Sequence, residues 1–123
     1  MVTLKVRIAA APARANEVTA ALVSLVGPVR SQPGCVATRV LNVLGEDNAV
    51  AFEEEWRSQS DLEQHFRTPA FRTLLATMEL ASRQPSFEVD LLDRRLGFEF
   101  VEGVLGFPQG EAFGGRRETP VEA

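Results

Sequence analysis

The chain has 123 residues, of which 45% are hydrophobic, and a formal net charge of −4. This length predicts one domain that is large enough to bury a core. The acidic balance argues against nucleic acid as a partner, because nucleic-acid binders neutralise phosphates with clustered lysine and arginine side chains.

The chain contains a single cysteine, Cys35. It can form neither an intrachain disulfide nor a thiolate metal cluster, so a reducing cytoplasm is the simplest location. The first residues alternate in hydrophobicity as a strand does, which predicts no secretory leader. No apolar run approaches the ~20 residues that a membrane helix needs, so we also expect no membrane partner.

The N-terminal part of the chain predicts a strand followed by a helix. Residues 2–10 alternate in hydrophobicity, and one face of this strand is apolar, formed by Val2, Leu4, Val6 and Ile8. Residues 15–26 carry an apolar stripe at helical spacing, and Gly27 and Pro28 are expected to stop that helix.

The next part predicts a turn and a hairpin. Residues 31–34, with proline followed by glycine, indicate a type II turn. Residues 35–44 are rich in valine and threonine, and residues 49–56 alternate in polarity. A short polar segment, residues 45–48, separates them. These two segments are therefore expected to form an antiparallel hairpin.

The hydrophobic period changes from two to nearly four along residues 52–71. Trp56 ends the predicted strand, and either Ser60 or Asp61 is expected to cap a short helix that carries His65. Thr68 and the proline after it then indicate the N-cap and first position of a second main helix over residues 69–81. The tryptophan and the histidine are therefore expected to meet over one hollow.

Residues 86–92 alternate again and predict the last strand. The order βαββαβ predicts an α+β, ferredoxin-like fold, a four-stranded antiparallel sheet with two main helices on one face. Residues 93–106 remain apolar and are expected either to extend the last strand or to reach across to a partner. We expect one domain over residues 1–106 and a flexible tail over residues 107–123, where glycine, proline and charged residues dominate.

The sequence resembles the antibiotic biosynthesis monooxygenase family over roughly residues 2–92. The resemblance rests on Pro33-Gly34-Cys35, Phe52-x-Glu54-x-Trp56-x-Ser58, Asp61-Leu62, His65, Thr68, Phe71 and Leu74-Leu75. It implies a dimeric α/β barrel, in which the sheet of a second subunit covers the open face. It also implies three functional classes, which are cofactor-independent quinol or anthrone oxygenases, haem-degrading enzymes and proteins without a known reaction.

His65 is the only histidine and the first candidate for a catalytic base, while Trp56 is suited to stacking on a flat aromatic substrate. The alternation places Glu54 on the inner face, where a carboxylate needs a partner or protonation, and Arg39 or Asn42 is expected to be that partner. The residues expected to line the substrate site are Phe52, Phe66, Phe71, Leu74 and Met78. Each of these side chains also has a purely structural interpretation, as a core residue or a hydrogen-bonded histidine.

The leading hypothesis is a cofactor-independent monooxygenase that oxidises a quinol or anthrone-like aromatic with O₂. His65 would be the base, and Arg39 or Asn42 would stabilise the oxyanion. No metal-ligand cluster and no flavin or nicotinamide motif is visible. The alternative is a non-catalytic, small-molecule-binding or stress-related dimer. Haem degradation is less favoured, because the first strand lacks the asparagine that the haem-degrading members use.

A homodimer is expected because a sheet with helices on one face leaves its other face to water. The apolar face of the first strand, Val2 to Ile8, is expected to supply part of the interface. The second and third strands keep apolar residues on both faces, among them Val36, Ala37, Val40, Leu41, Val50 and Ala51.

Overall fold

The computed structural model describes residues 1–91 and 94–106. In chain order the elements are β1 (Val2–Ala9), a 3-10 turn η1 (Pro12–Arg14), α1 (Ala15–Arg30), β2 (Cys35–Asn42), β3 (Ala49–Trp56), α2 (Gln59–His65), α3 (Pro69–Met78), β4 (Ser86–Asp90), β5 (Arg95–Leu96) and α4 (Glu99–Leu105).

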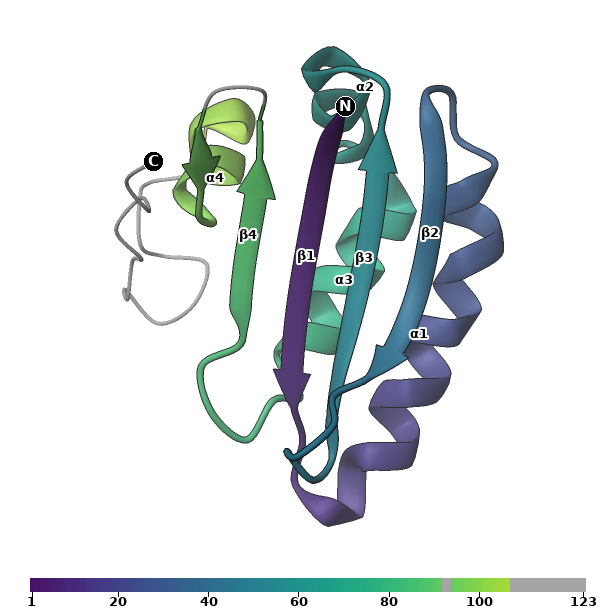
Figure 1. Cartoon of the computed structure of the whole chain (residues 1–123), viewed down its shortest axis with the longest axis vertical. Coiled ribbons are helices and arrows are strands. Elements are labelled where there is room, and N and C mark those ends of the chain that lie inside the picture. Colours follow the sequence, from purple (N-terminus) through teal and green to yellow (C-terminus); the bar gives the residue numbers. More distant parts are fainter. Residues whose placement is uncertain (92–93, 107–123) are drawn as a thin grey trace.

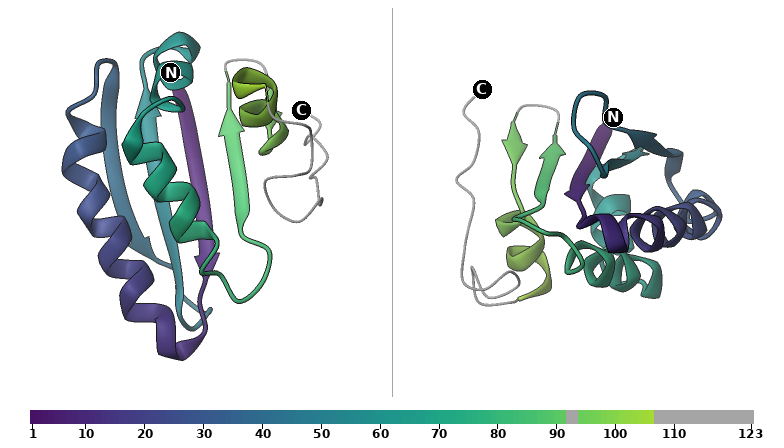
Figure 2. Two further views of the ribbon diagram at one scale, coloured as in Figure 1. Left: turned by 180° about the vertical axis from the view of Figure 1, so that it is seen from behind. Right: turned by 90° about the horizontal axis from the view of Figure 1, so that it is seen from below.

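The strands form one antiparallel sheet in the order β2-β3-β1-β4-β5. The helices α1 and α3 lie on one face of this sheet, and the other face is open (Figures 1 and 2). The predicted α+β, ferredoxin-like arrangement is confirmed, with five strands in place of the expected four. The fifth strand is short, and among the described residues it pairs with β4 alone.

The core lies between the sheet and its helices. The inner face of β1, Val2 to Ile8, is buried beneath the helices, and Phe52 of β3 and Phe87 of β4 lie on the same side. The prediction that this face of β1 contributes to a dimer interface is therefore wrong, because a strand that alternates apolar and charged residues turns its apolar side to the larger core.

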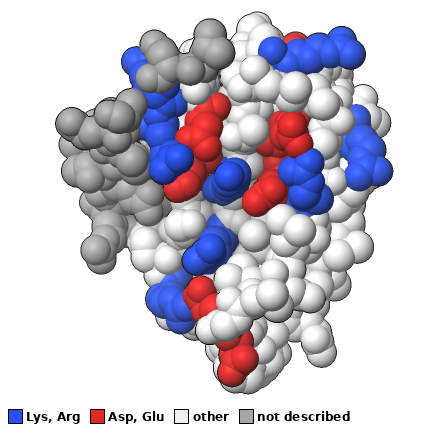
Figure 3. Space-filling view, viewed as in Figure 1, with Lys and Arg blue, Asp and Glu red and all other residues white. Residues whose placement is uncertain are grey.

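Charged residues of both signs gather on the open face of the sheet (Figure 3). Arg39 of β2 forms ion pairs with Glu53 and Glu55 of β3, and these two carboxylates raise the pKa of the guanidinium. Lys5 of β1 lies between Glu53 and Glu88 in the strand register. Opposite charges on neighbouring strands stabilise a solvated sheet face.

The helix α1 is longer than expected. It continues through Gly27 and Pro28 and ends at Arg30, so the prediction that this pair stops it is wrong. The proline removes one backbone donor on an exposed side, while Val29 in the last turn is 1% exposed and packs in the core. Arg30 also donates a 3.0 Å hydrogen bond to the carbonyl oxygen of Thr38, which ties the last turn to β2.

The helices α2 and α3 each begin at a hydroxyl side chain that acts as the N-cap. Ser58, and not Ser60 or Asp61, caps α2 by accepting from the backbone N–H of Asp61 at 3.1 Å. Thr68 caps α3, as expected, and accepts from the backbone N–H of Phe71. Ser58 takes this position because its backbone is still extended, directly after β3 ends.

The C-terminal segment folds back onto its own domain. β5 pairs with β4, and Val101 of α4 is buried in the core. Phe98, the residue before α4, is also buried, and the centroid of its ring lies 5.0 Å from that of Phe87. The described residues therefore follow neither expected course, since they turn back instead of extending β4 or leaving the domain. Residues 92–93 and the predicted tail, residues 107–123, lie outside the described part.

Candidate functional site

The candidate site lies where β3 ends and α2 begins. Trp56 is the last residue of β3, and His65 is the last residue of α2. Their rings are stacked, with centroids 4.7 Å apart and planes inclined by 28°. Trp56 is 0% exposed and His65 is 1% exposed. The expected meeting of the two residues is confirmed, and it places the imidazole inside the core. The hollow that was expected beside them stays a prediction.

Glu54 connects both rings from the inner face of β3. Its Oε1 atom accepts a 2.9 Å hydrogen bond from Nε1–H of Trp56, and its Oε2 atom lies 3.0 Å from Nε2 of His65. The side chains of Glu54 and His65 are fully buried. A carboxylate in such a place needs these partners, because an unpaired buried charge is strongly disfavoured.

Gln32 holds the other ring nitrogen of His65. The amide oxygen of Gln32 lies 2.7 Å from Nδ1 of His65, and its amide nitrogen donates to the hydroxyl of Thr68 at 3.3 Å. That hydroxyl uses its own hydrogen to bond the carbonyl oxygen of His65 at 2.8 Å, so it can only accept from Gln32. This order fixes the orientation of the amide, and Nδ1 of His65 is therefore the donor to Gln32.

The geometry also fixes the number of protons in the Glu54–His65 pair. Without a proton, the lone pair of Nε2 of His65 would face the lone pairs of Oε2 of Glu54 at 3.0 Å, which is repulsive. One proton therefore lies between Nε2 and Oε2. With Nδ1 of His65 also protonated, the pair is neutral as a whole, either as imidazolium and carboxylate or as imidazole and carboxylic acid. A neutral pair avoids burying a net charge.

The structure does not bring Arg39 or Asn42 to this site. Arg39 bonds Glu53 and Glu55 on the open face, and Asn42 is exposed and lies opposite Val50, at the far end of β3 from Trp56. The expectation that either residue partners Glu54 is therefore wrong, and neither is placed to stabilise an oxyanion beside His65. The partners of Glu54 come instead from its own strand and from α2.

Among the expected lining residues, Phe71 makes a ring contact with the imidazole, edge to face at 5.3 Å. Its own ring packs against Phe66 at 4.9 Å. The remaining three, Phe52, Leu74 and Met78, are buried members of the same core. Among the hydrogen-bond and ring partners of His65, Glu54, Trp56 and Phe71 are buried and Gln32 is half-buried.

Gln32 and Thr68 carry parts of the network that the sequence pattern did not indicate. Gln32 reads as an ordinary turn residue, because it stands between the end of a helix and a Pro-Gly pair. Thr68 was recognisable only as a helix cap, and its second bond to a glutamine 36 positions earlier has no local sequence signal.

Cys35 lies at the start of β2, with its sulfur 3.2 Å from the hydroxyl of Thr38. Burial raises the pKa of its thiol above the ordinary value. The thiol is thus protonated at neutral pH and a poor nucleophile. Within residues 1–91 and 94–106, no cluster of three or more histidine, cysteine or acidic side chains is placed to bind a metal ion. The helices of the same residues include none long and apolar enough to cross a membrane.

The family model described as antibiotic biosynthesis monooxygenase matches residues 1–77, which include the whole His65 network. The chain belongs to this family. Among curated proteins, an uncharacterised protein of Synechocystis sp. is 37% identical over 60 residues. That alignment covers 49% of this chain and 41% of the relative, so the chain matches less than half of the relative's length.

Several solved structures share the fold. A crystal structure of an antibiotic biosynthesis monooxygenase superposes with a TM-score of 0.66 at 20% identity, over 74% of this chain and 97% of the other. Rv0793 from Mycobacterium tuberculosis gives 0.66 at 21% identity, over 73% and 92%. PA3566 from Pseudomonas aeruginosa gives 0.62 at 26% identity, over 78% and 91%. Most of each neighbour is covered, so this chain has the core of the family fold.

Proposed function

We propose that this family member is a cofactor-independent monooxygenase that oxidises a reduced aromatic, of the quinol or anthrone type, with O₂. The observation that carries the proposal is the buried Glu54–His65 pair. Nε2 of His65 is hydrogen-bonded to Glu54, and Nδ1 is hydrogen-bonded to the half-buried Gln32. An oriented imidazole with one replaceable partner is suited to proton transfer.

In this mechanism the substrate oxygen replaces the amide oxygen of Gln32 at Nδ1 of His65. Nδ1 first releases its own proton to solvent, and Glu54 keeps Nε2–H in place, so that the bare Nδ1 can take a proton from the substrate. Trp56 stacks on the face of the imidazole, and Phe71 packs against it edge to face, so both rings fix its orientation. The substrate enters past Gln32 in this mechanism, because the other hydrogen-bond and ring partners of the imidazole, Glu54, Trp56 and Phe71, are buried.

The proton transfer leaves an electron-rich anion that gives one electron to O₂. The carbon and superoxide radicals then combine, which forms the new C–O bond, and the peroxide oxygen takes back the proton from Nδ1 of His65. Cleavage of the O–O bond with loss of the remaining C–H proton gives a carbonyl group and water. For a methylene substrate the sum is R₂CH₂ + O₂ → R₂C=O + H₂O, in which carbon is oxidised and O₂ is reduced.

The test measures O₂ consumption with a panel of quinols and anthrones. We expect His65→Gln, which can form hydrogen bonds but cannot transfer protons as imidazole does, to lower turnover by ~10²–10⁴-fold. Circular dichroism would establish that the variant is folded, and Gln64→Met, an exposed change on the same helix, is the control. Equal rates for wild type and His65→Gln would remove His65 from the mechanism.

The burial of His65 favours a second candidate function, a binding protein without a reaction. The imidazole is 1% exposed and is packed between aromatic rings, as a structural histidine would be. If no compound of the panel consumes O₂, but aromatic compounds still change the fluorescence of Trp56, the only tryptophan, the binding function is the better description.

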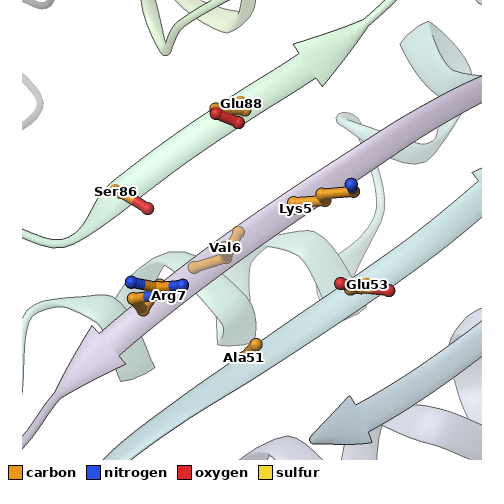
Figure 4. A pocket seen from close by; sticks show the side chains of 7 residues that line it. All are labelled: Lys5, Val6, Arg7, Ala51, Glu53, Ser86 and Glu88. Carbon is orange, nitrogen blue, oxygen red and sulfur yellow. The ribbon is translucent and has the colours of Figure 1, made fainter. Parts of the chain in front are cut away.

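A homodimer through the open face is part of the proposal. The face combines charges of both signs with small apolar residues such as Ala51, and a hollow of about 260 Å³ lies there between Lys5, Arg7, Ala51, Glu53, Ser86 and Glu88 (Figure 4). A face with both signs of charge can be complementary to a second copy of itself across a two-fold axis. Charged side chains form much of the lining of the hollow, and the hollow lies across the sheet from His65, so we do not assign the aromatic substrate to it.

Light scattering at micromolar concentration is expected to give twice the chain mass of 13.5 kDa. Obligate dimers of this kind bury ~2,000 Å² or more. Ala51→Arg, which adds a cation beside Lys5 and Arg7, should shift the protein toward monomer. Val23→Arg adds the same charge at an exposed position of α1 and should leave the dimer intact. A folded wild-type monomer would rule out the face-to-face dimer.

A further inference from the structure

We infer that Gln32 is a positioning residue for His65: it keeps the proton on Nδ1 and occupies the place that a substrate oxygen takes. The first part stands on the network geometry alone. The second part rests on the function proposed above, because it assigns Gln32 the control of access to that same nitrogen.

The backbone of Gln32 is fixed while its side chain is replaceable. Its N–H donates to the carbonyl oxygen of Val29 at 3.1 Å, and its carbonyl oxygen accepts from the N–H of Cys35 at 3.1 Å. The side chain has two hydrogen bonds, of 2.7 Å to His65 and 3.3 Å to Thr68. Rotation of this one side chain would therefore uncover Nδ1 without unwinding α1 or moving β2.

The Gln32 carbonyl selects the protonated form of Nδ1. A carbonyl oxygen only accepts, so the 2.7 Å contact is favourable when Nδ1 of His65 carries hydrogen and repulsive when it is bare. A base must offer a bare nitrogen. Gln32 thus holds the network in the form that can donate a proton, and the form that can accept one appears when the side chain leaves.

Two substitutions at this position should act in opposite directions. Gln32→Met keeps the length of the side chain but removes the acceptor, so Nδ1 should lose its proton at a lower pH than in wild type. Gln32→Glu places a carboxylate there and should keep the proton to a higher pH. A hydrogen bond to an ionised group corresponds to about one pH unit or more in each direction.

The other ionisable groups around the network are the same in all variants. They are Glu54 on β3, the Cys35 thiol on β2, Asp61 on α2, which lies against Gly34, and Arg30 on α1. Because none of them changes, a difference between the variants at residue 32 reports on the contact with Nδ1.

The experiment uses the full chain without a histidine tag, labelled with ¹⁵N-histidine. His65 is the only histidine, so a long-range ¹H–¹⁵N spectrum contains one imidazole and shows which nitrogen is protonated. At neutral pH, wild type and Gln32→Glu should show a protonated Nδ1, and Gln32→Met should shift toward a bare one. Gln64→Met, the same change at an exposed glutamine, should match wild type.

A bare Nδ1 in wild type, or identical pH profiles for Gln32→Met and Gln32→Glu, would overturn the inference. O₂ consumption gives the second measurement, in which we expect a lower KM for Gln32→Met and at least tenfold slower turnover for Gln32→Glu. If the spectra behave as expected but no variant consumes O₂, the positioning by Gln32 stands and the proposed monooxygenase function fails. If the rates differ as expected but the spectra do not, the inference that Gln32 keeps the proton on Nδ1 of His65 is wrong.

Discussion

Replacing Glu54 by leucine is expected to lower the free energy of unfolding by about 3–5 kcal/mol, because it breaks a buried pair by removing one partner. The change leaves Nε1–H of Trp56 and Nε2 of His65 facing an apolar side chain. Both groups are fully buried, so water cannot replace the carboxylate unless the structure opens. Urea denaturation followed by circular dichroism measures the loss.

Glu54→Gln is the matched control for this prediction. A glutamine amide can accept from Trp56 with its oxygen and donate to Nε2 of His65 with its nitrogen, so it reproduces the single proton between residues 54 and 65. We expect this variant to cost less than about 1 kcal/mol. If Glu54→Gln is as unstable as Glu54→Leu, the proton count derived from the geometry is incorrect.

Gly34→Ala is expected to lower the free energy of unfolding by about 2–3 kcal/mol. Gly34 has a φ of 84°, where a side chain costs about 1–2 kcal/mol. A Cβ atom there would also lie 2.2 Å from Cγ of Asp61, so α2 or the Asp61 side chain has to move. That movement would disturb the bonds between Asp61 and the Ser58 cap, which contribute about 1 kcal/mol.

Gly45→Ala separates the cost of the backbone strain from the cost of the contact with Asp61. Gly45 has nearly the same φ, 82°, but nothing lies within 4 Å of the position of its Cβ. Its substitution by alanine should therefore cost only the backbone strain, about 1–2 kcal/mol. Thermal or urea unfolding of both variants gives the difference that belongs to the contact with Asp61. Equal losses would show that Asp61 adapts to the new methyl group without cost.

The local signals of the sequence were sufficient for much of the fold and for the meeting of Trp56 and His65. The alternation up to Trp56 and the helical spacing of His65 depend only on neighbouring residues. The structure has the strand and the helix that these two patterns predict. The Thr68-Pro69 helix start is equally local. Patterns of this kind are predictable because the chain within a few residues determines them.

The partner of Glu54 was not predictable, because it depends on the register between two strands. The pairing of β2 with β3 is regular from Asn42 opposite Val50 to Ala37 opposite Glu55, and it places Arg39 opposite Glu53 on the open face. A register that differed by one residue would move Arg39 to the face of Glu54. The sequence of the two strands does not show which of these registers the hairpin adopts.

The helix end after Val26 was mispredicted for a related reason. A Gly-Pro pair is a strong local stop signal, but Val29 lies in the core and Arg30 bonds β2, so tertiary contacts offset the missing backbone bond. The same limit explains Gln32, whose partners Thr68 and His65 are more than 30 positions away. Long-range polar contacts leave no periodic trace in a sequence.

The two edges of the sheet also determine how this protein avoids aggregation. One edge is β5, which has two residues, and the other is β2, which has a bulge at its start and Arg39 within it. Short strands, bulges and charged side chains are the features that stop a strand of another molecule from pairing with an exposed edge. Within the described residues, both edges of the sheet therefore disfavour its growth into a continuous fibril.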